Sequence, residues 1–298
     1  MSFLGDNIKV HFVGSDGSEM YHAALKAADV HYRLYSCFPF IDKKKIDDNF
    51  ELSQNHIIRI QESEMNHVIQ DSGLFTLMFG AGKNRVVNHD YLLDWQDKLI
   101  KFVLQNNLKC TCVEIDCQKL LGVEEAWFFR ERMKRLLPNR QINVFHYEDG
   151  KYGFDRLIEF SDYIAISVPE LRILKSKTYK TDAVKLAEYC KKKKPSIDIH
   201  MLGCTEFTML KDLTFCTTCD STSWLSGVRY GYFNDGKKQG HINTFKKEIV
   251  EERMRQISLY AKQKKLEYTE KTLSYSTAAS LCATICKNKY EKQAGSQN

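Results

Sequence analysis

The chain has 298 residues, of which 43% are hydrophobic and only four are proline. This composition can bury a sizeable core in one large domain or in two small ones. No stretch approaches the roughly 18 apolar residues of a membrane-spanning helix, and residues 1–9 lack the basic and apolar segments of a secretory signal. Ten scattered cysteines in such a chain predict reduced thiols in the cytoplasm.

The net charge of +6 is unevenly distributed along the chain. Residues 246–298 hold 11 lysines and arginines against 6 acidic residues, so the remainder of the chain is nearly neutral. A basic terminal segment of this kind suits contact with a phosphate backbone. The alternative is a solvated helical face with no nucleic-acid partner.

Strand-like segments rich in β-branched and aromatic residues recur along the chain. They are residues 9–13, 30–38, 66–70, 110–115, 142–145, 163–168, 197–202 and 213–219. Helical segments lie between most of them. Asn88 is placed to cap a helix whose apolar residues follow a 3.6-residue period, namely Leu92, Trp95, Leu99, Phe102 and Val103.

Two further helices are predicted in the same way. One carries Ala126, Phe129, Met133, Leu136 and Leu137 on one face and stops before Pro138, and the other covers residues 181–194. This alternation of strands and helices predicts an α/β fold with a parallel sheet. Eight such units in about 230 residues favour a (β/α)8 TIM barrel. The alternative is a doubly wound sheet, although Gly14-Ser15-Asp16-Gly17 does not match a dinucleotide-binding turn.

The predicted organisation is a catalytic barrel over residues 1–240 and a basic, helical C-terminal extension over residues 241–298. Within the extension, residues 245–268 have the pattern of a long amphipathic helix and residues 277–287 that of a last helix. Residues 293–298 are expected to be disordered.

Polar residues end several of the predicted strands. In a TIM barrel the carboxyl ends of the strands carry the active site. The residues at these ends are Asp71, Asp116, His146, Ser167, Gly203 and Asp220. Each acid alone could be a helix cap or a turn residue. Together at one barrel mouth, they predict a site.

Two of these carboxylates, Asp220 and Asp71, suit chemistry at the anomeric carbon of a sugar. One carboxylate can attack that carbon while the other manages a proton on the leaving or entering group. A separation of about 5 Å favours a covalent intermediate and retained configuration. Like charges that close keep one of the two acids protonated, so that it can donate.

Several motifs resemble those of tRNA-guanine transglycosylases. Asp71-Ser72-Gly73-Leu74-Phe75 resembles the Asp-Ser-Gly-Gly-Phe-Gln motif of that family, and Asp116-Cys117 resembles its base-recognition motif in shortened form. Residues 165–170 resemble its Gly-Gly-Leu-Ala-Val-Gly-Glu segment, and residues 200–203 match the strand before its nucleophile. Asp220-Ser221-Thr222-Ser223-Trp224 stands where the nucleophile lies.

The chain is more similar still to the shortened, phage-type DNA 7-deazaguanine transglycosylases. Phe12-Val13-Gly14, residues 71–75 and residues 220–224 supply the motifs of that group, and the resemblance covers roughly residues 8–235. It implies exchange of guanine in DNA for a 7-deazaguanine base through a covalent aspartyl intermediate. It also implies that no cofactor is needed, and that the protein works in the cytoplasm, or in the host cytoplasm if a phage encodes it.

The resemblance also implies roles for single residues. Asp220 would be the nucleophile, Asp71 the general acid and base, and Asp116 the acid that binds the base edge. Ser72 and Ser167 would donate to the base, with Gly73, Phe75 and Gly203 beside them, and His146 replaces a family glutamine. Trp224 could stack on a base or pack beneath the mouth loops, and Arg229 could hold a phosphate.

One departure concerns metal binding. The tRNA enzymes bind structural zinc through three cysteines and a histidine beyond the nucleophile, whereas only Cys282 and Cys286 follow Asp220 here. The pair Cys110 and Cys112 would share one strand face, and Cys216 and Cys219 would point to opposite faces. No metal site is therefore expected, and the substrate expectation moves toward DNA.

Three alternatives remain open at this stage. The same exchange could act on tRNA. The chain could be a non-catalytic nucleic-acid-binding barrel, or it could be a glycosidase that passes the sugar to water.

Overall fold

The structure is a computed structural model. It describes residues 8–41, 46–63, 67–79, 85–204, 206–230 and 274–294, together with single residues and short pieces between 251 and 265. Among these residues, no helix is both long enough and apolar enough to cross a bilayer. The amphipathic helix expected over residues 245–268 falls largely outside the described residues, as do residues 295–298.

Eight strands form a closed barrel in which the order around the barrel is the order along the chain. The pairs from β2/β3 to β7/β8 are all parallel. The strands are β1 Lys9–Val13, β2 Arg33–Ser36, β3 Val68–Asp71, β4 Thr111–Val113, β5 Gln141–Phe145, β6 Tyr163–Ser167, β7 Asp198–Leu202 and β8 Thr218–Ser221. The predicted (β/α)8 barrel is confirmed, and the open doubly wound sheet is excluded.

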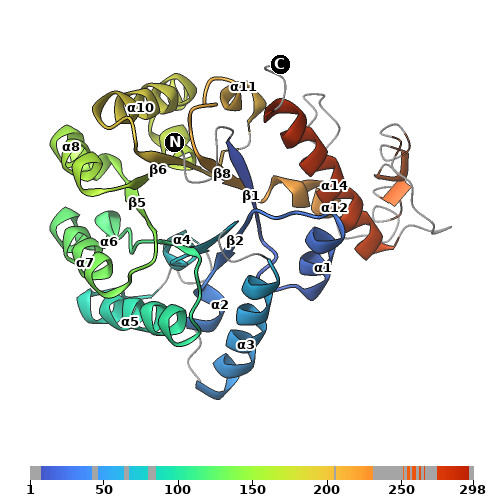
Figure 1. Ribbon diagram of the computed structural model, residues 1–298, viewed down its shortest axis with the longest axis horizontal. Coiled ribbons are helices and arrows are strands. Elements are labelled where there is room, and N and C mark those ends of the chain that lie inside the picture. Colours follow the sequence, from blue (N-terminus) through green and yellow to red (C-terminus); the bar gives the residue numbers. More distant parts are fainter. Residues whose placement is uncertain are drawn as a thin grey trace. The chain divides into compact units, whose positions relative to one another are not determined.

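Helices separate most of the strands and cover the outside of the barrel (Figure 1). Between β2 and β5 these are α2 Phe38–Ile41, α3 Ile46–Glu62, α4 Leu74–Phe79, α5 His89–Gln105, α6 Gln118–Leu121 and α7 Val123–Leu136. Between β5 and β8 they are the short 3₁₀ turn η2 Tyr147–Asp149, α8 Gly150–Phe160, α9 Val168–Leu174, α10 Tyr179–Lys193 and α11 Phe207–Leu210.

Local sequence signals explain how the outer helices begin. The Asn88 side chain accepts a hydrogen bond of 2.9 Å from the Tyr91 backbone N–H, which satisfies one of the free donors at the start of α5. All five apolar residues expected on one face of this helix are buried. In α7 the expectation for Leu136 is wrong, because this last residue of the helix is 40% exposed.

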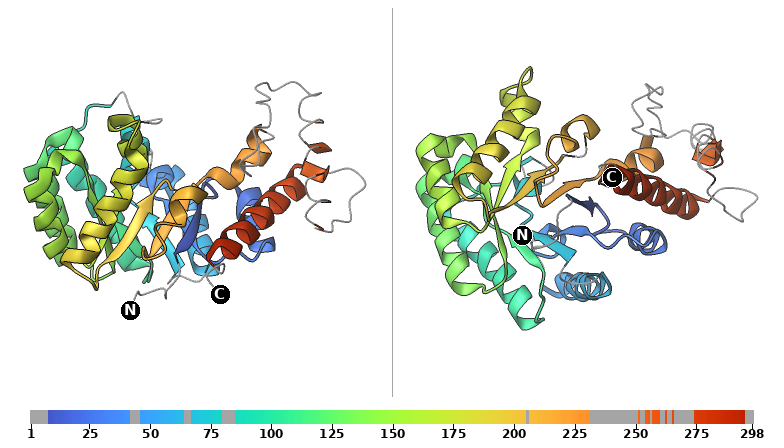
Figure 2. Two further views of the ribbon diagram at one scale, coloured as in Figure 1. Left: turned by 90° about the horizontal axis from the view of Figure 1, so that it is seen from above. Right: turned by 45° about the horizontal axis from the view of Figure 1, so that its top comes forward.

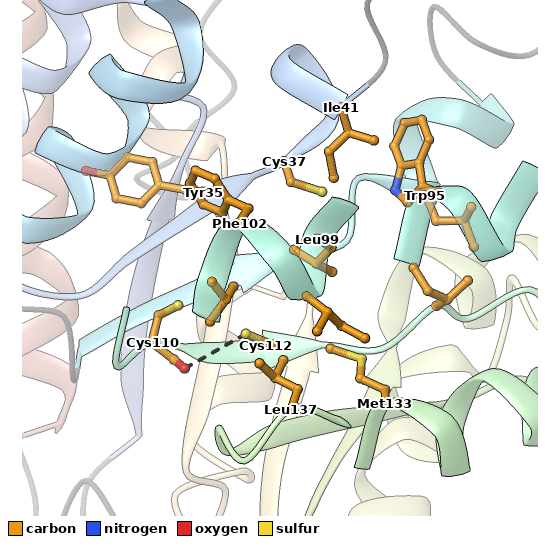
Figure 3. Packing of buried hydrophobic residues seen from close by; sticks show 14 of the residues in the cluster. Tyr35, Cys37, Ile41, Trp95, Leu99, Phe102, Cys110, Cys112, Met133 and Leu137 are labelled. Carbon is orange, nitrogen blue, oxygen red and sulfur yellow. Dashed lines mark hydrogen bonds between the residues drawn. The ribbon is translucent and has the colours of Figure 1, made fainter. Parts of the chain in front are cut away.

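An apolar layer lies between the barrel wall and the helices α2 to α7 (Figure 3). Trp95 and Leu99 of α5 pack there with Met133 of α7 and with Cys112 of β4. Cys110 and Cys112 both belong to this layer, as the alternation predicted, and the Cys112 thiol points to the Cys110 carbonyl at 3.9 Å. They pack as small hydrophobic residues.

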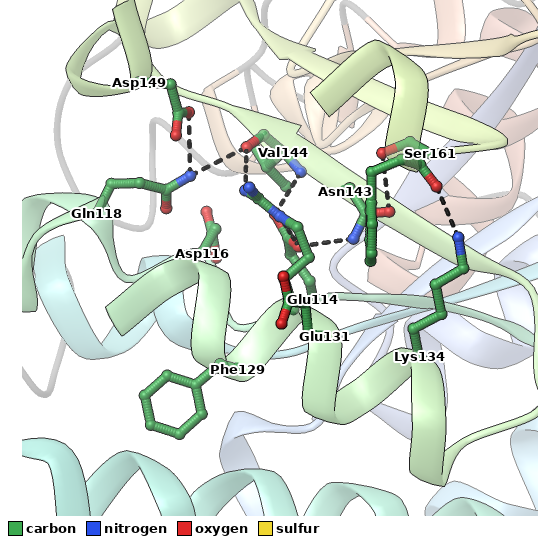
Figure 4. A network of polar contacts seen from close by, with 12 residues as sticks. Glu114, Asp116, Gln118, Phe129, Glu131, Lys134, Asn143, Val144, Asp149 and Ser161 are labelled. Atoms are coloured by element: carbon green, nitrogen blue, oxygen red, sulfur yellow. Dashed lines mark hydrogen bonds and ion pairs between the residues drawn. The ribbon is translucent and has the colours of Figure 1, made fainter. Parts of the chain in front are cut away.

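A buried ion pair ties α7 to the barrel wall (Figure 4). Arg130 donates from Nε and Nη2 to the two carboxylate oxygens of Glu114, at 2.7 and 2.8 Å, and both side chains are fully buried. Glu114 also accepts from the Asn143 amide at 2.6 Å and from the Val144 backbone N–H at 2.7 Å. The carboxylate therefore has donors enough to offset its desolvation.

The chain divides into two compact units, of which the first is Met1–His11 with Tyr32–Asp220 and the second is Phe12–His31 with Ser221–Asn298. The boundary expected at residue 240 falls among residues 231–250, which are not described. In the second unit, α14 Tyr275–Ala294 lies along α1 Glu19–Ala27, as both views of Figure 2 show, and the short η3 Ser223–Leu225 and α12 Ser226–Tyr230 also contact α14.

Candidate active site

Asp220 lies inside β8, not after it as the sequence predicted. Its Oδ1 accepts a hydrogen bond of 2.7 Å from the Gly203 backbone N–H, at the end of the neighbouring strand β7. His200 Nε2 lies 3.2 Å from the same oxygen. The Asp220 side chain is 13% exposed, so it is held by the barrel yet still meets solvent.

Asp71 is the last residue of β3. The preceding Gln70 points outward, where its Oε1 meets His56 Nε2 of α3 at 2.9 Å. Side chains alternate along a strand, so Asp71 points to the opposite face, which is the barrel interior. Because neighbouring strands run parallel, Asp71 and Asp220 lie at the same end of the barrel.

A glycine positions each of these two acids. Gly73 donates its N–H to Asp71 Oδ2 at 2.9 Å, as Gly203 does to Asp220. Both glycines have positive φ, +79° and +61°. A Cβ at Gly73 would lie 2.8 Å from the Phe38 backbone nitrogen, and one at Gly203 would lie 2.6 Å from Pro169 Cγ. Only glycine fits either turn.

A chain of charged groups occupies the ends of β4, β5 and β6. His146 Nε2 lies 3.1 Å from Asp116 Oδ2, and His146 Nδ1 lies 3.1 Å from Glu170 Oε2. Lys119 then pairs with Glu170 Oε1 at 2.6 Å. The charges alternate in sign along Lys119, Glu170, His146 and Asp116, and Asp116 is the more exposed of the two acids.

This arrangement keeps His146 protonated. Burial by itself lowers the pKa of His146, but its hydrogen bonds to Asp116 and Glu170 and their negative charges raise that pKa to about 10. The same contact with His146, together with Lys119, outweighs burial and lowers the pKa of Glu170. Both ring nitrogens of His146 contact carboxylates, and one of these contacts holds Asp116. A contact between His146 and a substrate base stays a prediction.

The hydroxyls of the two serines expected to donate to a base each accept a hydrogen bond from a nearby backbone N–H. Ser167 caps α9, and its hydroxyl accepts from the Glu170 N–H at 3.4 Å. Ser72 is buried, and its hydroxyl accepts from the Leu74 N–H at 3.4 Å. Its carbonyl accepts from the Trp95 indole at 2.7 Å and from the Cys37 thiol at 2.8 Å. Phe75, on α4, is 61% exposed.

The remaining two expected residues belong to the second unit. Trp224 is 1% exposed, donates its indole N–H to the Val13 carbonyl at 2.8 Å, and packs against Phe12 and Tyr21. This favours the packing role over stacking on a base. Arg229 is exposed, with its guanidinium 5.9 Å from the centre of the Tyr21 ring.

One group in the described part of the chain has the proximity of metal ligands, namely His146, Glu148 and Glu170. Its members do not suit a cation, because His146 is held protonated and Glu170 is already paired with the Lys119 ammonium. His146 and Glu170 therefore belong to a network of ion pairs and do not form a metal site.

Sequence reasoning did not select three residues of this site. Glu170 and Lys119 complete the charge chain, and His200 lies behind Asp220. Strand alternation could have identified His200, since it stands two residues before the end of β7. No protein-family model matches the chain, and no curated protein has a significantly similar sequence.

Proposed function

We propose that this protein exchanges a nucleobase, replacing guanine in DNA with a 7-deazaguanine base through a covalent bond between Asp220 and the sugar. The observation that carries the proposal is the pair of carboxylates, Asp71 and Asp220. They lie at the same end of the barrel, and each is oriented by the N–H of a glycine that nothing else could replace.

The exchange takes two displacements. A carboxylate oxygen of Asp220 attacks C1′, and the C1′–N9 bond breaks with its electron pair moving to guanine, which takes a proton from the Asp71 carboxyl. The entering base then gives its N9 proton to Asp71 and attacks C1′. The C1′–oxygen bond breaks, and its electron pair returns to the Asp220 carboxylate.

Asp116 is suited to bind the base. Its Oδ2 is held by His146, and the buried Glu170, which is paired with Lys119, stands behind that histidine. A fixed carboxylate can accept hydrogen bonds from two adjacent N–H groups on the edge of a guanine-like base. Binding a base at Asp116 therefore requires the intact charge chain.

The choice of DNA rests on the sequence. The motifs resemble the DNA-modifying group, the zinc pattern of the tRNA enzymes is missing, and residues 246–298 are basic. Exchange on tRNA is the alternative substrate. The two substrates are distinguished by presenting duplex DNA, single-stranded DNA and tRNA to the protein, each with a labelled 7-deazaguanine base.

The decisive test is nucleoside mass spectrometry after such incubations. We expect the 7-deazaguanine nucleoside to appear in DNA with wild-type protein and to be absent with Asp220→Asn, which removes the nucleophile at nearly constant shape. The control is an unchanged melting temperature. Normal exchange by Asp220→Asn would contradict the mechanism. Guanine release without an added base would indicate a glycosidase, and no chemistry on any substrate would favour a binding protein.

A further inference from the structure

A line of buried polar groups leads through the barrel interior to Asp220. His200 of β7 is fully buried, with Nε2 3.2 Å from Asp220 Oδ1 and Nδ1 2.6 Å from Thr218 Oγ1. The Tyr163 hydroxyl, from β6, meets the same Thr218 oxygen. Four side chains on three adjacent strands thus form one connected line that ends at the candidate nucleophile.

Each hydrogen bond along this line can be donated toward Asp220. Burial raises the pKa of Tyr163, so its hydroxyl keeps its proton and can donate to Thr218. Thr218 then has its own proton to donate to His200 Nδ1, which leaves the ring proton on Nε2. In the structure that buried N–H makes no hydrogen bond, and Asp220 Oδ1, an oxygen that can only accept while the carboxylate is ionised, lies 3.2 Å from Nε2.

A second buried histidine, His11, lies beside His200. The His11 ring lies 6.3 Å from the His200 ring, and burial followed by the proximity of His200 lowers the pKa of His11 to about 3. His11 therefore adds no positive charge beneath the line.

We propose that His200 is a positioning residue for Asp220: a small turn of the ring or of the carboxylate gives its buried, unpartnered Nε2–H a hydrogen bond to Oδ1, so that the other oxygen, Oδ2, faces the sugar. The role given to Oδ2 rests on the proposed function of Asp220 as nucleophile. Gly203 N–H is the second donor to Oδ1. When the bond from C1′ to Oδ2 breaks in the second displacement, the returning negative charge is stabilised by the same two donors.

The proton order is tested by nitrogen NMR of the full chain labelled at histidine, with the His200 signals identified by their loss in His200→Gln. We expect the tautomer protonated at Nε2, and we expect both His200 nitrogen signals to move in Asp220→Asn. A His200 tautomer protonated at Nδ1 would overturn the proposal. So would His200 nitrogen signals that do not shift in Asp220→Asn. This measurement needs no activity, so it decides the contact even if base exchange is never found.

The positioning role is tested by two substitutions, one that replaces the donor at Nε2 of His200 and one that replaces only the group at Nδ1. Glutamine at position 200 can place an amide N–H where Nε2 stands, whereas asparagine reaches only the place of Nδ1. We expect His200→Gln to retain exchange within about 3-fold and His200→Asn to lose about 10-fold or more in kcat, the size of one hydrogen bond.

Thermal unfolding of both variants separates this effect from general damage. Equal loss in the two variants at matched stability would overturn the positioning role, as would wild-type kcat in His200→Asn. If the wild-type protein exchanges no base at all, the proposed function fails by itself. The NMR result then still decides whether His200 holds Asp220.

Discussion

At the scale of single residues, the candidate site depends on glycines as much as on acids. Gly203 has φ of +61° and a Cβ there would meet Pro169, whereas Gly122 has φ of +95° with open space around it, and Gly17 has neither constraint. These three positions separate backbone strain from steric overlap, because each has one of the two effects fewer than the position before it.

We therefore predict a graded series of alanine variants. Gly17→Ala should be neutral, Gly122→Ala should lose about 1 kcal/mol of folding free energy through strain, and Gly203→Ala should lose about 2 kcal/mol or more. Only Gly203→Ala should also lose exchange, because it displaces the donor to Asp220. Urea unfolding and nucleoside analysis measure the two effects. Equal behaviour of Gly203→Ala and Gly122→Ala would contradict the steric argument.

The sequence located the acids but not their surroundings. Asp71 and Asp220 could be selected because several acids end predicted strands and a barrel brings those ends to one mouth. Lys119, Glu170 and His200 are ordinary polar residues in helices or strands, and their importance arises only when three or more strands close side by side. His146 was selected, but its commitment to two carboxylates depends on side-chain reach that no spacing rule supplies.

At the scale of elements, α7 is attached to the barrel by a buried charge pair. Arg130 of α7 binds Glu114 just after β4, two residues before Asp116, so the pair fixes the segment that carries the acid proposed to bind the base. Glu114 was read from the sequence only as part of a strand. Its partner lies 16 residues further along the chain, on a face of α7 that was predicted to be apolar.

We predict that Arg130→Met destabilises the protein by about 3 to 5 kcal/mol, because it leaves the Glu114 carboxylate buried without its counter-charge. Adding Glu114→Leu should recover part of that loss, since two apolar side chains can fill the same volume. Denaturant unfolding of both single variants and the double variant gives the coupling free energy. Additive losses would contradict a direct interaction.

The ends of a strand can be predicted where a local residue sets them, and not where apolar residues are explained by burial in the folded protein. β1 begins and ends where it was predicted, because Gly14 stops the strand locally. β8 was expected at residues 213–219 but runs from Thr218 to Ser221. Leu213 and Cys216 are apolar because they are buried, and not because they are in a strand.

At the scale of the whole molecule, buried histidines set opposing pH dependences. Burial lowers the pKa of His11 to about 3 and that of His56 to about 4, whereas the carboxylates beside His146 outweigh burial and raise its pKa to about 10. For His11 and His56 the unfolded chain binds the proton more readily, so stability falls as pH drops below about 6.5. For His146 the folded chain binds it, so stability falls as pH rises from about 6.5 toward 10.

We predict that the free energy of unfolding between pH 5 and pH 9 is greatest near pH 6.5. Urea titrations at pH 5, 6.5, 8 and 9 measure it. His146→Gln should flatten the alkaline side, because a glutamine has no proton to lose, while leaving the acidic side unchanged. A wild-type stability that increases from pH 6.5 to pH 9 would contradict the pairing of His146 with Asp116 and Glu170.

The second unit has a consequence for the order of events during synthesis. Its helix α1 lies along α14, and the Lys287 ammonium reaches the Asp29 carbonyl across 258 residues of chain. At ribosomal speeds of about 5 to 20 residues per second, α1 leaves the ribosome between about 10 and 50 seconds before its partner exists. During that interval the apolar face of α1 has no cover from α14. The face of α1 that meets α14 therefore stays exposed on the nascent chain, open to any holding chaperone, until α14 has been made.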